Sequence, residues 1–349
     1  MGALKKKTGV FYGVNAALVI VVFAVLVLLV DSGTLSRYNT NMLTTVCINI
    51  ILAVSLNMVT GILGQLVLGH AGFMLAGAYA AALFTKNIGL PLSISLPIGL
   101  VLGGLLAAVF GIVIGIPALR LRGDYLAILT LGFGEIIRVV AMNLNITNGA
   151  KGLGGIGTLQ TRDNPAGMFI YAFVVAVLLI FLSFTFGRSR HGRAVISIRE
   201  DEIASESMGI NTTYYKLFAF VLAAFFAGVA GGLEAHQIGM IGPAKYDFNR
   251  SVEILIMVVL GGMGSITGAV ISASVLTLLP EMLRDMLQDV VGNFDQWRML
   301  IYAVILILVM LFKPTGLLGR YEISIPGLAR KCLHVVRNRR SGKAPKGEA

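Results

Sequence analysis

The stretch Gly99–Gly115, GLVLGGLLAAVFGIVIG, contains no charged residue and lies within a longer apolar run over residues 92–116. About 20 apolar residues are what a helix needs to cross the hydrocarbon core of a bilayer. Within the stretch, glycines recur four residues apart, as at Gly99 and Gly103. Small residues at this spacing are typical of membrane helices whose backbones pack closely. The stretch therefore predicts a tightly packed transmembrane helix.

The rest of the chain has the same apolar character. Hydrophobic residues make up 56% of it and charged residues 13%, against roughly 25% charged residues in ordinary soluble domains. Apolar runs predict about ten membrane-spanning helices, near residues 10–30, 42–63, 66–85, 92–116, 125–142, 167–187, 216–236, 250–262, 265–282 and 297–313. We therefore predict an all-α polytopic membrane protein.

Three of these runs are ambiguous because glycines interrupt them or separate them. The segment 66–85 contains LGHAGFMLAGAYA, and the segments 250–262 and 265–282 are separated only by a glycine-rich turn. Each of the three is either a full span or a half-helix. The interrupted regions fall in opposite halves of the chain, which fits two inverted repeats, an arrangement in which binding sites lie at broken helices.

The distribution of lysine and arginine predicts the topology, because these residues accumulate in the cytoplasmic loops of membrane proteins. With the N-terminus inside, the cytoplasmic segments hold Lys5–Lys7, Arg120 and Arg122, four arginines between Arg188 and Arg199, and the tail after residue 313. The net charge of +11 is thus explained by a membrane protein with both termini in the cytoplasm. Nucleic-acid binding, the other common reason for a basic chain, is not expected.

The predicted spans also divide the chain into segments. Residues 1–9 form a basic cytoplasmic N-terminus, residues 10–313 a transmembrane domain with a cytoplasmic loop over 188–215, and residues 314–349 a basic tail whose polar end we expect to be disordered. The lysines before the first apolar run resemble the start of a signal peptide. However, that run is too long, and no A-x-A cleavage motif follows before Asp31. We therefore expect an uncleaved first span.

Motifs for cofactors and metals give no positive prediction. The sequence GLGGIG at Gly152–Gly157 fits the dinucleotide-binding pattern, but that pattern needs a preceding strand and a following helix, and here it follows a predicted span. The chain contains no G-x-x-x-x-G-K-[ST] motif, so we expect ATP hydrolysis to come from another chain. Its four histidines are scattered, which argues against a metal site. We expect no cofactor, no metal and no catalytic residue in this chain.

The cytoplasmic loop contains REDEIASESMGIN at Arg199–Asn211, an acidic stretch in a chain that has only 17 acidic residues. Asp201 to Met208 is predicted to form a short helix, because acids suit the positive end of a helix dipole and Gly209 is placed to end the helix. One interpretation is a solvated loop. The other is a docking helix, whose acids meet basic residues of a soluble partner while Ile203 and Met208 supply apolar contacts.

His70 is a candidate for a translocation pathway, together with the neighbouring Gly69 and Gly72, because an ionisable residue at membrane depth is usually functional. It lies near the start of the third predicted span, between Gly69 and Gly72. The alternative is a structural histidine, bonded to backbone carbonyls that are freed where these glycines loosen the helix.

Three charged residues in predicted spans are further pathway candidates. Glu135 and Arg138 lie three residues apart on one face of the fifth span, and Glu253 lies near the start of the eighth. A charge near the bilayer centre costs about 2.5 to 3.5 kcal/mol on insertion scales, so all three side chains should face protein or water. Glu135 and Arg138 form either an internal pair that holds two helices together or a polar wall of the pathway, and Glu253 is a similar case.

Five blocks of the sequence, taken in order, resemble the permease subunits of branched-chain amino acid ABC importers, of the LivM type. The blocks are GQLVLGHAGFMLAGAYAAAL, LRGDYLAILTLGFGEIIRVV, HGRAVISIREDEIASESMGIN, KLFAFVLAAFFAGVAGGL and MVVLGGMGSITGAV, and the resemblance covers roughly residues 40–315. It implies a subunit of the bacterial inner membrane that translocates leucine, isoleucine or valine. It also implies four kinds of contact: a second related permease, two cytoplasmic ATP-binding subunits, a periplasmic substrate-binding protein and membrane lipid.

The resemblance also implies which residues couple the chain to its ATPases: Arg199, Glu200, Asp201, Glu202, Ile203, Ala204, Glu206, Met208 and Gly209. The family usually has alanine where this chain has Ser205 and Ser207. Urea and short-chain amide importers use similar permeases, so they are the alternative for the substrate. An ion-coupled secondary transporter is a remote alternative, which would need no ATPase and would leave the acidic stretch unexplained.

Overall fold

The computed structural model describes residues 24–30, 36–119, 124–160 and 164–291, together with positions 304, 307, 311, 316 and 319. In chain order its elements are α2 (Arg37–Asn57), the π-helical turn η1 (Met58–Leu63), α3 (His70–Asn87), α4 (Leu92–Ala118), α5 (Asp124–Asn143), the short turn η2 (Gly149–Lys151), β1 (Leu153–Gly154), α6 (Gly167–Arg188), α7 (Arg190–Glu200), α8 (Glu202–Ser207), α9 (Thr212–Ile238), β2 (Met240–Ile241), η3 (Pro243–Lys245), α10 (Phe248–Gly261) and α11 (Ile266–Val291). The predicted all-α class is confirmed.

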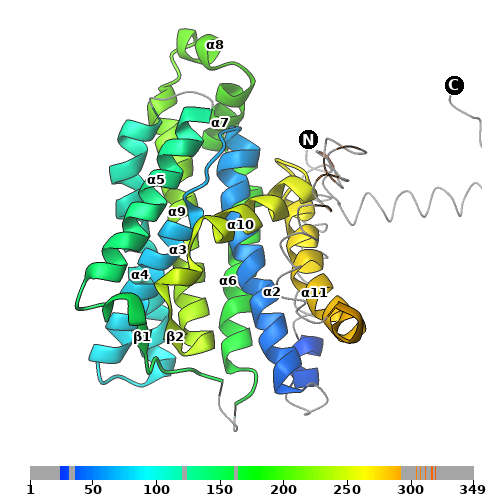
Figure 1. Cartoon of the computed structure of the whole chain (residues 1–349). Coiled ribbons are helices and arrows are strands. Elements are labelled where there is room, and N and C mark those ends of the chain that lie inside the picture. The colour runs from blue at the N-terminus through cyan, green and yellow to red at the C-terminus, as the bar shows by residue number, and fades with distance from the viewer. Residues whose placement is uncertain are drawn as a thin grey trace, which may run out of the picture.

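Within the described ranges, five helices are long and apolar enough to cross a membrane, namely α2 with η1, α4, α5, α6 and α9. They run side by side, with α8 projecting beyond one end of the bundle and the β1–β2 pair lying at the other (Figure 1). The predicted spans 10–30 and 297–313 fall largely outside the described residues, as do the terminal segments 1–9 and 314–349. The chain is therefore a multi-pass membrane protein, and the number of ten spans stays a prediction.

Helix α2 lies at the centre of the bundle. All of its residues from Val46 to Asn57 are buried, and it packs against α6, α9, α10 and α11. A helix that is apolar all round belongs in such an enclosed position. By contrast, α4 exposes large apolar side chains such as Val101, Val109 and Val113, as a helix with one face toward lipid does.

The glycines of α4 pack as their spacing predicts. A Cβ placed on Gly103 would lie 2.6 Å from the carbonyl oxygen of Gly77 on α3, and one placed on Gly111 would lie 2.9 Å from Cβ of Ala224 on α9. A Cβ on Gly77 would in turn meet the backbone of Gly228 on α9. The backbones of α3, α4 and α9 thus approach so closely that only hydrogen fits between them.

Replacing Gly77 by valine is expected to destabilise the protein by about 1 to 3 kcal/mol, because overpacking forces the backbones of closely packed helices apart. The loss is measured as a lower midpoint of thermal unfolding in detergent, followed by size-exclusion chromatography. Gly89→Val is the matched control, since a Cβ on Gly89 meets nothing within 4 Å. Equal midpoints for the two variants would contradict the close packing.

Two helices of the bundle begin inside it rather than at its end. After η1 the chain turns at Gly64, with φ of +78°, and residues 64–69 are non-helical before α3 begins at His70. Non-helical backbone at membrane depth must be buried in protein or line water, and here the Leu68 N–H donates to Thr130 Oγ1 of α5 at 3.2 Å.

The second interrupted region contains α10, which has 14 residues and so is about 21 Å long. This is shorter than the hydrocarbon core of about 30 Å, and α10 lies near mid-height in the bundle (Figure 1). The predicted segment 250–262 is therefore a half-helix. Helix α11 has 26 residues with Pro280 inside it, and its apolar part covers Ile266–Pro280.

The glycine-rich segment Gly152–Gly157 forms a turn at the end of the bundle opposite α8. Gly152 and Gly155 have φ of +79° and +70°, and between them Leu153 pairs with Ile241 in the short antiparallel ladder of β1 and β2. The segment thus serves as a connection between helices.

Candidate functional site

Helix α8 is defined at both ends by local side-chain chemistry. The Asp201 carboxylate accepts a hydrogen bond from the Ala204 N–H at 2.9 Å, which satisfies a backbone donor that the helix leaves open. Gly209 has φ of +82°, so it ends the helix in the left-handed conformation that glycine tolerates best. The Asn211 side chain then accepts from the Tyr214 N–H at 3.0 Å and begins α9. The predicted short helix is confirmed.

Helix α8 has an inner face that fixes it to the bundle. The Glu202 carboxylate lies 2.7 Å from Nζ of Lys216, whose side chain is only 3% exposed at the start of α9. Ser205 is buried, and its hydroxyl donates to the Asp201 carbonyl at 2.8 Å. Glu202 therefore has an internal partner, a contact that the acidic pattern alone did not indicate.

The outer face of α8 is open. Ile203 is 66% exposed and Met208 is 83% exposed, and each lies within three residues of an exposed acid, Glu200 at the end of α7 or Glu206 in α8. Large apolar side chains with this exposure, at the tip of a short helix that projects from the bundle (Figure 1), form a small amphipathic surface. We call Glu200, Ile203, Glu206 and Met208 the tip surface.

Arg199 turns into the protein although it directly precedes the tip surface. It lies in the last turn of α7, and its guanidinium donates to the carbonyl oxygen of Gly61 in η1. A Cβ on Gly64 would lie 2.7 Å from Cγ of Arg199. Helix α7 itself packs on the bundle through Val195 and Ile198, three residues apart on one face.

A small open cavity lies where the start of α3, the middle of α5 and the start of α10 meet. Its lining consists of Leu68, Ala71, Gly72, Leu131, Gly134, Glu135, Tyr246, Asp247, Phe248 and Ser251. The Ala71 N–H donates to Ser251 Oγ at 3.2 Å, which joins the two helices that begin inside the bundle. Two of the predicted pathway residues, Gly72 and Glu135, are thus brought together.

His70 is the first residue of α3 and is buried. Its Nε2 lies 2.9 Å from the Ser55 hydroxyl on α2, so its partner is a side chain of the central helix rather than a freed carbonyl. A Cβ on Gly72 would lie 2.6 Å from Cα of Gly134, which shows that this glycine allows α3 to lie against α5. These contacts fit a structural role for His70.

Glu135 and Arg138 form an ion pair, with Oε2 of Glu135 lying 2.6 Å from Nη2 of Arg138. Both residues belong to α5, so the pair lies along one helix and does not hold two helices together. The side chains are 33% and 23% exposed, respectively. They lie on a helix that also exposes Ile128 and Ile136, so this face of α5 combines charge with apolar surface.

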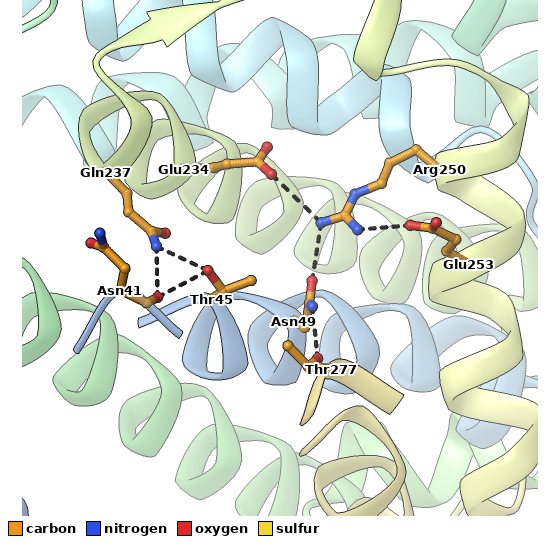
Figure 2. A network of polar contacts seen from close by, with 8 residues as sticks. All are labelled: Asn41, Thr45, Asn49, Glu234, Gln237, Arg250, Glu253 and Thr277. Atoms are coloured by element: carbon orange, nitrogen blue, oxygen red, sulfur yellow. Dashed lines mark hydrogen bonds and ion pairs between the residues drawn. The ribbon is translucent and has the colours of Figure 1, made fainter. Parts of the chain in front are cut away.

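A polar network links α2, α9, α10 and α11 around Arg250 (Figure 2). Nη1 of Arg250 lies 3.0 Å from the Glu253 carboxylate, and Nη2 lies 3.7 Å from Glu234 and donates to Asn49 Oδ1 at 3.0 Å. The Asn49 amide donates in turn to the Thr277 hydroxyl at 2.8 Å. These contacts hold the half-helix α10 to the central helix and to α9.

Helix α2 is also bonded directly to α9. The Gln237 amide donates to the Asn41 carbonyl at 2.8 Å and to Thr45 Oγ1 at 2.9 Å (Figure 2). Sequence patterns singled out Glu253 in this region but missed Glu234 and Arg250. Glu234 lies inside a predicted span, so the rule that drew attention to Glu135 would also have found it.

This chain is similar in sequence to known membrane proteins. Residues 38–310 match the family described as branched-chain amino acid transport system / permease component. The chain is 38% identical over 277 residues to the high-affinity branched-chain amino acid transport system permease protein LivM of Salmonella typhimurium and to LivM of Escherichia coli; each alignment covers 71% of this chain and 62% of the relative. The permease protein LivH of Escherichia coli is 33% identical over 159 residues, which are 45% of this chain and 48% of LivH.

Proposed function

This chain belongs to the family of branched-chain amino acid transport permease components, and we propose that it is the membrane-spanning subunit of an ABC importer. It moves leucine, isoleucine or valine across the bacterial inner membrane, while partner subunits bind and hydrolyse ATP. The observation that carries the proposal is the tip surface: exposed Ile203 and Met208 beside acids, on a helix that projects from one end of the bundle. An apolar anchor with an acidic rim suits a basic groove on a soluble ATPase.

The orientation of the chain in the membrane is proposed from the arginines at the α8 end of the bundle. Arg188, Arg190, Arg193 and Arg199 all lie in or beside α7, next to α8, and basic residues favour the cytoplasmic side. The α8 end therefore faces the cytoplasm, where ATP is available. For the termini we propose the same side of the membrane because both terminal segments are rich in lysine or arginine. The end with β1 and β2 meets the periplasmic substrate-binding protein.

The pathway runs along α5, at the interface with a second, related permease. The face with the Glu135–Arg138 pair is partly exposed and borders the cavity between α3 and α10. Charges in contact with lipid are costly, which supports the proposal that this face contacts protein and water rather than lipid. Movement of α8 by the ATPases then alternates the access of the pathway between the two sides of the membrane.

The proposal is tested with the complete transporter, assembled from this chain, its partner permease, the two ATPases and the binding protein, and reconstituted in liposomes. Uptake of radiolabelled leucine is expected with the binding protein outside and ATP inside, and a non-hydrolysable ATP analogue is the control. Uptake of urea without leucine would replace the substrate by the alternative. Uptake that continues without ATP but follows an ion gradient would contradict the ABC mechanism.

A further inference from the structure

Arg199 lies at a junction of three segments that are far apart in the sequence. Its guanidinium donates to the carbonyl of Gly61 in η1, and a Cβ on Gly264 would lie 3.1 Å from Nη1 of Arg199. Gly264 belongs to the turn between α10 and α11. One side chain from the last turn of α7 thus lies against η1, which continues the central helix, and against the turn that follows the half-helix α10.

The two ends that Arg199 contacts are also joined to each other. The Asn57 side chain accepts from the Gly264 N–H at 2.9 Å and donates to the Ser265 carbonyl at 3.1 Å. Gly61 lies so close to Gly264 that any side chain at Gly61 would meet the Gly264 backbone. We call Asn57, Gly61, Gly264 and Ser265 the helix-end junction. Because its parts are bonded and closely packed, displacement of one part displaces the others.

Two segments of the chain connect the helix-end junction to the cavity. On one side, residues 64–69 connect η1 to the start of α3, and on the other side α10 extends from Phe248 to Gly261. Both α3 and α10 contribute their first residues to the cavity lining. A shift at the junction therefore reaches both helices that border the proposed pathway.

We propose that Arg199 is a positioning residue that transmits movement of α8 to the helix-end junction and so to α3 and α10. The proposal rests on the proposed function and deepens it. It also reassigns Arg199 from the surface that meets the ATPase to the interior of the permease. Helix α8 has a second attachment, the ion pair of Glu202 with Lys216, but this one leads into α9, a continuous helix of 27 residues that does not begin at the cavity.

The experiment uses the complete transporter in liposomes and measures leucine uptake and ATP hydrolysis together. In the Arg199→Met variant the stem of the side chain remains and the guanidinium is lost. We expect the complex to assemble and to hydrolyse ATP, while uptake per ATP falls by about tenfold, within the usual range of coupling between sites. Arg199→Lys keeps the charge and one donor group, and its leucine uptake per ATP is expected to lie between those of the wild type and Arg199→Met.

Arg193→Met is the matched control, because Arg193 lies on the same helix α7 but is exposed; its ratio is expected to equal that of the wild type. If Arg199→Met does not assemble, Arg199→Lys decides. If an assembled Arg199 variant takes up as much leucine per ATP as the wild type, the role of Arg199 alone is overturned. Failure of both variants to assemble would also overturn it, because Arg199 would then be assigned to folding. Absence of ATP-dependent uptake in the wild-type transporter would overturn the proposed function and this proposal with it.

Discussion

Replacing Ile203 and Met208 by aspartate together is expected to abolish leucine uptake and to release the ATPases from the permease. Both side chains are largely exposed, at 66% and 83%, so the changes leave the interior of the bundle intact. In a docked complex they would be buried, and loss of a central apolar anchor costs about 2 kcal/mol or more at protein interfaces. Aspartate would also place a charge where the docked partner buries an apolar side chain, and burying a charge without a partner is costly. The measurement is co-purification of the ATPases with the tagged permease, followed by uptake.

Met240→Asp provides the control for this double variant. Met240 is 48% exposed, but it lies in β2 at the opposite end of the bundle (Figure 1), where no ATPase is expected to dock. Full ATPase co-purification by the double variant would show that the tip surface is a solvated loop. Glu202 is unsuitable for such a test, since reversing its charge would also break the internal pair with Lys216.

Replacing Arg250 by methionine is expected to destabilise the permease by about 3 to 5 kcal/mol, because the loss of one partner leaves buried charge uncompensated. Glu234 and Glu253 both pair with Arg250, and the three side chains are at most 21% exposed. The variant also removes the bond to Asn49 that holds α10 to α2. We expect a low yield of monodisperse protein and a lower midpoint of thermal unfolding in detergent.

A rescue experiment separates charge from shape in this network. Adding Glu234→Gln and Glu253→Gln to the Arg250→Met variant removes the uncompensated charges while keeping the side-chain volumes, so part of the stability should return. Arg138→Met is the comparison, since its pair with Glu135 lies along one helix and is partly exposed; a smaller loss of stability is expected there than for Arg250→Met. An unfolding midpoint for Arg250→Met equal to that of the wild type would contradict the structural importance of the network.

Features with local causes could be predicted from the sequence. Apolar runs predicted the five long apolar helices of the described ranges, α2 with η1, α4, α5, α6 and α9, because the bilayer selects length and hydropathy irrespective of the neighbours. The glycine spacing from Gly99 onward predicted close packing, although it did not name α3 and α9 as the partners. The short helix at Asp201 to Met208 was predictable because its cap and its stop are set by residues within one turn.

Features that depend on distant partners could not be predicted in this way. The acidic pattern made Glu202 and Arg199 equivalent members of one docking stretch, yet Glu202 bonds to Lys216 and Arg199 reaches Gly61. Arg250 stood at the edge of an apolar run and gave no sign of its partners on other helices, Glu234 and Asn49. Each of these contacts joins segments that only folding brings together.

The sequence by itself thus determined a helical membrane protein with a capped helix in the loop between its sixth and seventh predicted spans, because membrane insertion and helix capping act over one span or one turn. The tertiary structure decided which faces of that helix are free, where α3 and α10 begin inside the bundle, and which charges are paired. Those outcomes depend on the directions of side chains across helices separated by up to 228 positions, as between Asn49 and Thr277. Only the packed bundle fixes these directions, because a buried charge is stable only where a partner from another helix lies within reach.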